Sequence, residues 1–163
     1  MRCLSREIFR VQVSPNSCHV LFPETAALAT AWRRFLKNPQ VADHVSRILL
    51  LGAAQWGLYE LLAWVVMANH IHVLLRPLVP LKKALMNVKS ATARAANATL
   101  CRTGRPFWQD ESYDHWVRND RERGSITRYI EYNPVAAGLV VAPEDWRWSS
   151  AGWQRMALPH NSP

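Results

Sequence analysis

Two apolar, strand-forming runs separated by a short turn lie in the middle of the chain. Leu58–Met67 (LYELLAWVVM) consists mostly of aromatic, Leu and Val residues, which is typical of a strand buried on both faces. His70–Leu75 (HIHVLL) alternates, and Ala68 and Asn69 between the two runs predict a tight turn. A β-hairpin is therefore predicted, and the fold must place it in a hydrophobic core.

The stretch Ile48–Ala68 is apolar and about long enough to cross a membrane. It contains Gln55, Gly57 and Glu60, however, and a charge at mid-span is costly. We therefore expect the end of a buried helix, a turn and a buried strand in this stretch, and no membrane partner.

The flanking patterns predict further strands and helices around the hairpin. We place a strand at Glu7–Val13, helices at Glu24–Leu36 and Val41–Leu51 interrupted by Pro39, a helix at Leu81–Leu100, a strand at Tyr113–Val117, and a helix from about Arg121 to Asn133 capped by Asp120. This order predicts an α+β fold, a ferredoxin-like or RRM-like antiparallel sheet with helices packed mainly on one face. We expect a single domain over residues 1–163, with 152–163 as a disordered tail.

The charge balance fits a polyanionic partner, because the formal net charge is +8. Every charged residue from Arg76 to Arg105 is basic. The candidate phosphate contacts are Arg76, Lys82, Lys83, Lys89 and Arg94, with Arg102 and Arg105 nearby. For any single one of them, a solvated helix face is the alternative.

The cysteines argue for a reducing compartment. Cys3, Cys18 and Cys101 form no CxxC pair and are odd in number, which disfavours a disulfide scaffold and a zinc ribbon. We therefore expect a cytoplasmic protein.

The motif His70-Ile71-His72 is the first candidate for chemistry. Side chains alternate along a strand, so both histidines share one face while Ile71 points to the other. Two imidazoles on one face can share a metal ion. The alternative is a chance pair of surface histidines, which is the better explanation of the motif taken alone.

Tyr129 and Asn133 are the second candidate. They stand four residues apart on a predicted helix and therefore share a face. A tyrosine can act as a covalent nucleophile, and an asparagine carbonyl oxygen can complete a metal site beside two histidines. The alternative is a half-buried helix aromatic and a helix end before Pro134.

Four segments together resemble a known family. They are AWVVMANHIHVLLRP, RPFWQDESYDHWVRNDRE, ITRYIEYNPVAAGLV and PEDWRWSSA, in that order. They resemble the REP-associated tyrosine transposases, which are HUH-class single-tyrosine transposases. The resemblance covers roughly Gly57 to Ala151. Ala68 stands where the family more often has proline, and the first 40 or so residues match poorly, although the family has an edge-forming first strand there.

The resemblance implies roles for individual residues. His70 and His72 match the HUH histidines and would bind Mg²⁺ or Mn²⁺, and Asn133 matches the third protein ligand. Tyr129 matches the nucleophile. Tyr132 and Tyr113 are rivals for this role. Tyr132 lacks the motif match, and Tyr113 lies on the predicted YDH strand, where a structural role is expected.

Other residues near these motifs carry weaker expectations. His115 is a candidate proton shuttle or partner of the metal ligands, with a structural role as the alternative. Trp108 and Trp116 are candidates for base stacking, although core packing is the safer expectation for both. Asp114 and Glu131 are left without a role.

The resemblance further implies a function. The chain would cut single-stranded or hairpin DNA at REP sequences of a mobile element, and would rejoin it through a 5′-phosphotyrosine. We expect a monomer or homodimer associated with the bacterial nucleoid. The alternatives are a non-catalytic DNA-binding relative, a metal-dependent phosphoesterase and, much more weakly, a protein of the membrane surface.

Overall fold

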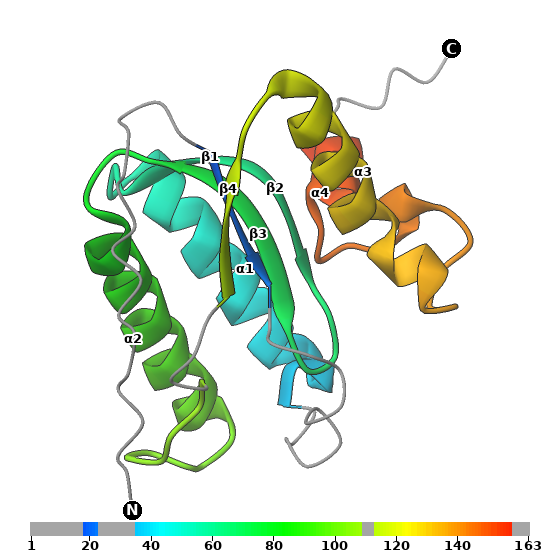
Figure 1. The fold of residues 1–163 in the computed structure, drawn as a ribbon. Coiled ribbons are helices and arrows are strands. Elements are labelled where there is room, and N and C mark those ends of the chain that lie inside the picture. Colours follow the sequence, from blue (N-terminus) through cyan, green and yellow to red (C-terminus); the bar gives the residue numbers. More distant parts are fainter. Residues whose placement is uncertain (1–17, 23–34, 109–112, 158–163) are drawn as a thin grey trace, which may run out of the picture.

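The computed structural model describes residues 18–22, 35–108 and 113–157 of the chain, and its described strands form one antiparallel sheet (Figure 1). The sheet order is β2-β3-β1-β4. The strands are β1 (Cys18–Phe22), β2 (Tyr59–Val66), β3 (Ile71–Pro77) and β4 (Tyr113–Val117). The predicted hairpin is confirmed, because β2 and β3 pair antiparallel with Val65 opposite His72.

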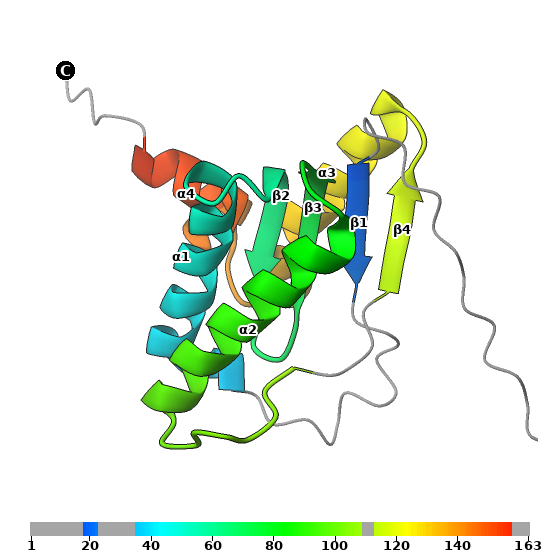
Figure 2. The ribbon, with the colours of Figure 1, turned by 90° about the vertical axis from the view of Figure 1, so that its left-hand side faces the viewer.

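Helices cover both faces of this sheet (Figure 2). The described helices are η1 (Phe35–Lys37), α1 (Pro39–Ala54), α2 (Leu81–Thr99), α3 (Asp120–Ala136), η2 (Pro143–Asp145) and α4 (Ser150–Ala157). Up to β4 the order of strands and long helices is β-α-β-β-α-β, with α1 and α2 on one face, which confirms the ferredoxin-like α+β fold. The third long helix, α3, lies on the opposite face. No described helix is long and apolar enough to cross a membrane.

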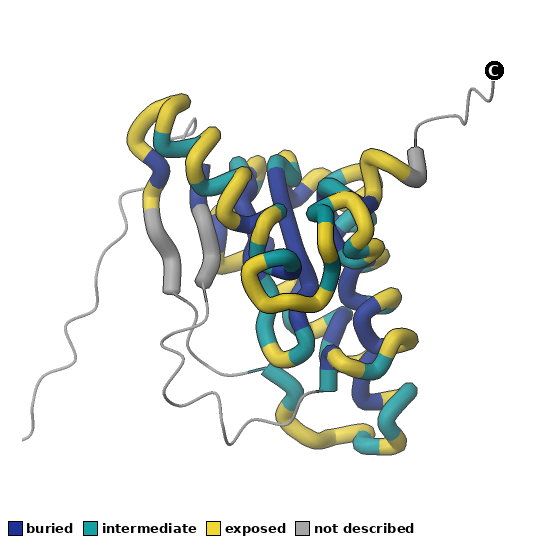
Figure 3. Tube along the Cα trace, turned by 90° about the vertical axis from the view of Figure 1, so that its right-hand side faces the viewer, coloured by how far each residue is buried: buried dark blue, intermediate teal, exposed yellow. Residues whose placement is uncertain are grey.

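Alternating side chains of the hairpin separate two hydrophobic cores. Val73 and Leu75 pack with α1 and α2, whereas Leu74 packs with Ile130 of α3. The strands between these helices are consequently buried on both faces (Figure 3). Burial on both faces is what the apolar run Leu58–Met67 predicts for β2.

The structure corrects the expected start of α1. Pro39 does not interrupt a helix but opens one, because the missing N–H of a first-turn proline has no helical partner to lose. Asn38 caps this helix by accepting a hydrogen bond from the backbone N–H of Gln40 at 2.9 Å. The strand expected at Glu7–Val13 lies outside the described residues, as does the expected helix at Glu24–Leu36 up to residue 34.

The structure also corrects both ends of α3. Asn119, not Asp120, is the cap, since its side chain accepts the N–H of Glu122 at 2.9 Å. The helix does not end at Asn133 but continues through Pro134 to Ala136. Pro134 is buried, so its packing outweighs the bias of a residue before proline against helix.

β1 is an interior strand, not the edge strand that the family resemblance leads one to expect. It pairs with β3 on one side and with β4 on the other. The sequence patterns predict no strand over its five residues, CHVLF. The apolar run between Pro15 and Pro23 was the available signal.

The C-terminal segment fastens α3 and β2 together. The backbone N–H of Val66 donates to the carbonyl of Trp148 at 2.8 Å, and the Trp146 indole donates to the carbonyl of Val66 at 3.0 Å. The Ser150 hydroxyl donates to Glu131 of α3 at 2.8 Å. The WRWSS segment, Trp146–Ser150, therefore has a structural role in joining these elements.

Gly52 of α1 provides a test of this packing. A Cβ at this position would meet the Tyr59 hydroxyl and lie 2.8 Å from its Cζ, and that hydroxyl is fixed because it donates to the Leu49 carbonyl at 2.9 Å. Gly52→Ala should therefore lower the free energy of unfolding by about 1–3 kcal/mol in chemical denaturation. Gly124→Ala in α3 is the matched control, because its Cβ would meet nothing within 4 Å. Equal stability of the two variants would contradict the packing.

Candidate active site

Two histidines converge at the start of β3. His70 directly precedes the strand and His72 is its second residue. Their Nε2 atoms are 3.1 Å apart and their ring centroids 4.7 Å apart. Both imidazoles thus present a ring nitrogen to the same point, as the alternation of the HxH motif predicts.

Asn69 orients the first of these imidazoles. Its Oδ1 lies 2.9 Å from Nδ1 of His70. An amide oxygen only accepts hydrogen bonds, so Nδ1 carries the proton and donates it, which leaves the lone pair on Nε2. The sequence indicated Asn69 only as a turn residue, and a polar residue directly before HxH was the signal for this second role.

The environment keeps both imidazoles neutral. Burial lowers the pKa of His72 from 6.5 to about 3, with His70 as a further cause. Burial also lowers the pKa of His70. The neutral imidazole is the form that binds a metal ion, so at neutral pH the pair needs no deprotonation before binding.

Tyr129 of α3 contacts the second of these histidines, His72. Its ring packs against that of His72, with centroids 5.7 Å apart and ring planes at 71°. The side chain is nevertheless 55% exposed, so solvent and substrate have access to it. Asn133 lies one helical turn further along the same side of α3 and is partly buried.

Two of the three predicted metal ligands lie side by side in the structure. His70 and His72 present neutral ring nitrogens 3.1 Å apart, and Asn133 lies one helical turn beyond Tyr129, which contacts His72. Within the described ranges no third His, Cys, Asp or Glu joins a group that could hold a metal. A further protein ligand from these ranges must therefore be of another type, such as the amide oxygen of Asn133.

The rival nucleophiles and the residues without an assigned role either have no described contact with the two histidines or have side chains that the structure does not describe. Tyr132 is 55% exposed on α3, and no described contact joins it to the histidines. Glu131 binds Ser150 and so has a structural role. In the backbone register Tyr113 lies opposite Phe22 and His115 opposite Val20. The side chains of Tyr113, Asp114 and His115 lie outside the described part.

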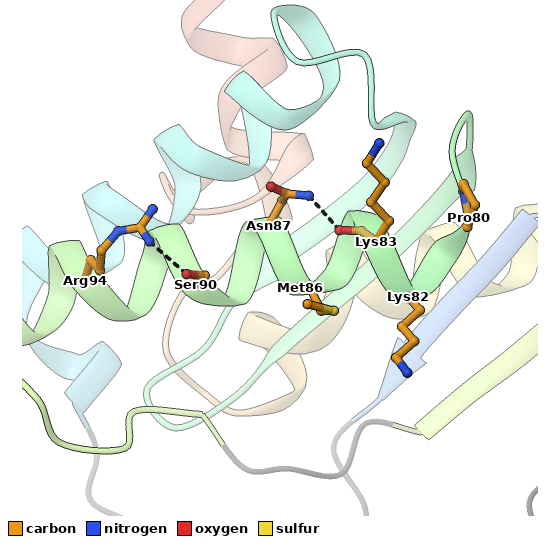
Figure 4. A pocket seen from close by; sticks show the side chains of 7 residues that line it. All are labelled: Pro80, Lys82, Lys83, Met86, Asn87, Ser90 and Arg94. Atoms are coloured by element: carbon orange, nitrogen blue, oxygen red, sulfur yellow. Dashed lines mark hydrogen bonds between the residues drawn. The ribbon is translucent and has the colours of Figure 1, made fainter.

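The predicted DNA-binding cations do not surround this site. Lys82, Lys83 and Arg94 are exposed on α2, across the sheet from His72, where they line a shallow groove (Figure 4). Lys89, also on α2, is partly buried. Arg76 of β3 forms an ion pair with Glu60 at 2.6 Å.

The two candidate stacking tryptophans differ. Trp108 is partly buried against the α1–α2 core and donates its indole N–H to Thr92 at 2.7 Å, which confirms core packing. Trp116 of β4 is 53% exposed, so the expectation of core packing is wrong there. An edge strand leaves such a side chain accessible.

Comparisons with known proteins identify the family and the fold of the chain. Residues 26–133 match the family described as "Transposase IS200 like". A REP-associated tyrosine transposase of Haemophilus influenzae is 39% identical to this chain over 44 residues. The aligned part is 27% of this chain and 25% of that protein, so the match spans a quarter of the relative's length. A solved REP-associated tyrosine transposase bound to a REP hairpin has a TM-score of 0.65 at 18% identity, covering 98% of this chain and 92% of that chain, which shows a shared fold. The resemblance inferred from the sequence is confirmed.

The buried imidazole of His72 predicts a pH dependence of stability. Its pKa is about 3 in the folded chain and near 6.5 when exposed on unfolding, so the unfolded state binds more protons between these values. The free energy of unfolding of the metal-free protein should therefore fall as the pH drops from 6.5 towards 3. Denaturant titrations at several pH values should show a shallower fall for His72→Gln. The same slope in both proteins would show that His72 is not held neutral by burial.

Proposed function

Because the chain belongs to the family of IS200-like transposases, we propose that it cuts and rejoins single-stranded DNA, with Tyr129 as the nucleophile. The observation that carries the proposal is the contact of the Tyr129 ring with His72, beside a second histidine whose Nε2 lies 3.1 Å from that of His72. An exposed tyrosine whose ring packs on one of two adjoining neutral imidazoles supports the proposal of nucleophilic attack on a phosphate.

His70, His72 and Asn133 would hold a divalent metal ion, for which Mg²⁺ and Mn²⁺ are the candidates. When bound there, the ion supplies Lewis-acid polarisation of a phosphate. Asn69 holds the His70 ring with its Nε2 lone pair toward the site. Packing of α3 on β2 and β3 through Ile130 keeps Tyr129 at the edge of the same site.

The covalent step balances without a co-reactant. The Tyr129 hydroxyl oxygen loses its proton and forms a bond to phosphorus, while the bond from phosphorus to the 3′-oxygen breaks and that oxygen leaves as a 3′-hydroxyl. The 5′ side remains attached to the tyrosine. Attack by a different 3′-hydroxyl reverses the step and joins strands, with the bond energy retained in the phosphotyrosine.

The proposed DNA contacts include the exposed cations of α2. Lys82, Lys83 and Arg94 line one groove along α2 together with Met86 and Ser90, with Lys82 and Lys83 pointing to opposite edges of the helix (Figure 4). Arg76 and Lys89 are weaker candidates, since Arg76 is already paired with Glu60. Because α2 lies across the sheet from Tyr129, these cations would bind parts of the DNA away from the scissile phosphate. The solved relative is described as bound to a REP hairpin, and hairpin DNA is accordingly the proposed ligand.

Covalent capture tests the nucleophile. Purified protein is incubated with a labelled single-stranded hairpin oligonucleotide, with Mn²⁺ or with EDTA, and run on a denaturing gel. Wild type should give a shifted band that needs Mn²⁺, and Tyr129→Phe should give none while still binding DNA in a native gel. Tyr132→Phe is the matched control and should keep the band. A band retained by Tyr129→Phe would refute the assignment, and no band with any protein would favour a non-catalytic DNA-binding relative.

Salt dependence tests the α2 contacts. Each phosphate contact contributes about 0.7–0.9 to the slope of log affinity against log salt, so the double variant Lys82→Gln, Lys83→Gln should lower the slope by about 1.5. Arg155→Gln on α4, whose arginine is paired with Asp145, is the control and should leave the slope unchanged. Identical slopes for wild type and the double variant, measured by fluorescence anisotropy, would remove α2 from the DNA interface.

A further inference from the structure

The side of α3 that faces solvent carries a second set of polar and aromatic residues next to Tyr129. Arg121, Ser125, Arg128 and Tyr132 follow one another at spacings of four, three and four residues, so they form one stripe along the helix, here called the outer face of α3. All four are exposed. Tyr129 lies between this stripe and the sheet.

The cations of the outer face are not neutralised by the acids of their own helix. Asp120 pairs with Arg123 at 3.2 Å, Glu122 accepts the backbone N–H of Arg118 at 2.7 Å, and Glu131 accepts the Ser150 hydroxyl. None of the ion pairs between described residues involves Arg121 or Arg128. Two positive charges therefore face solvent on the helix that carries the nucleophile.

These arginines differ from three arginines that form ion pairs elsewhere in the structure. Arg76, Arg147 and Arg155 each bind a carboxylate at 2.6–2.9 Å. The outer face of α3 also leaves the ring of Tyr132 55% exposed, three residues from Tyr129. Unpaired cations beside an exposed aromatic ring are the features with which proteins bind single strands, the cations at phosphates and the ring under a base.

We propose that the outer face of α3 binds the single strand next to the scissile phosphate, with Arg121 and Arg128 at phosphates and Tyr132 stacked on an unpaired base. The proposal rests on the proposed function, because it assumes that Tyr129 receives a phosphate. The occupant is a single strand, since a duplex has no free base face for Tyr132. Arg128 and Tyr132 are then DNA-binding residues on either side of the nucleophile, and Tyr132 is not a second nucleophile.

Anisotropy titrations of a short unpaired oligonucleotide over a salt series test the arginines. Arg121→Gln and Arg128→Gln should each lower the slope of log affinity against log salt by about 0.7, the value for one phosphate of a single strand. Arg47→Gln removes the same charge from an exposed position of α1, on the other side of the sheet, and should leave the slope unchanged. If Arg47→Gln lowers the slope as much as Arg128→Gln does, or if neither α3 variant lowers it, the proposal is wrong.

The ring of Tyr132 is tested in the same titrations. Tyr132→Leu should weaken binding by about tenfold with an unchanged salt slope, whereas Tyr132→Phe keeps the ring and should bind as wild type does. Equal affinity of both variants would overturn the stacking role.

The covalent gel, run on the same samples, separates this proposal from the proposed function. If wild type forms no adduct but the α3 variants bind as expected, strand cleavage fails and the binding surface stands. If wild type forms the adduct and all α3 variants bind normally, the binding surface fails and the nucleophile stands.

Discussion

The alternation of side chains along β3 is the constraint on which the rest of the molecule depends. Val73 and Leu75 pack with α1 and α2, while Leu74 packs with α3, so both faces of the strand are buried. A slip of one residue would exchange the two sets and would move His72 to the wrong face of the sheet. The packing that excludes water thus also determines which face carries the imidazoles, and burial there keeps them neutral.

The position of α3 completes the site. Ile130 anchors the helix in the core that Leu74 and Cys18 share, and Glu131 is bound by Ser150 of α4. These contacts fix the orientation of α3, so that Tyr129 lies between the buried and the solvent-facing sides of the helix and its ring contacts His72. The same helix therefore carries a residue of the core, Ile130, the candidate nucleophile, Tyr129, and the exposed basic outer face. The helical repeat fixes their relative directions, because side chains three and four residues apart lie on the same side of a helix.

The sequence predicts the elements whose signals are local. The hairpin, α2 and β4 follow from alternation and helical spacing, and the placement of His70 and His72 on one face follows from the strand period alone. β1 is missed because its five residues are recognisable mainly by their pairing with distant strands. The proximity of Tyr129 to His72 comes from the family motif and not from spacing, because no local rule relates residues on separate elements. The placement of α2 across the sheet from the site depends on the topology, so a basic stretch in the sequence does not reveal it.

The central claim is that Tyr129, whose ring packs against His72, forms the bond to DNA. Mass spectrometry of the trapped adduct tests it most directly. Trypsin cuts after Arg128 and next after Arg147, so Tyr129 and Tyr132 fall in one peptide whose fragment ions tell them apart. The account predicts a nucleotide remnant on Tyr129 that forms with Mn²⁺ and is absent with EDTA. A remnant on Tyr132, or on a residue outside this peptide, would contradict it.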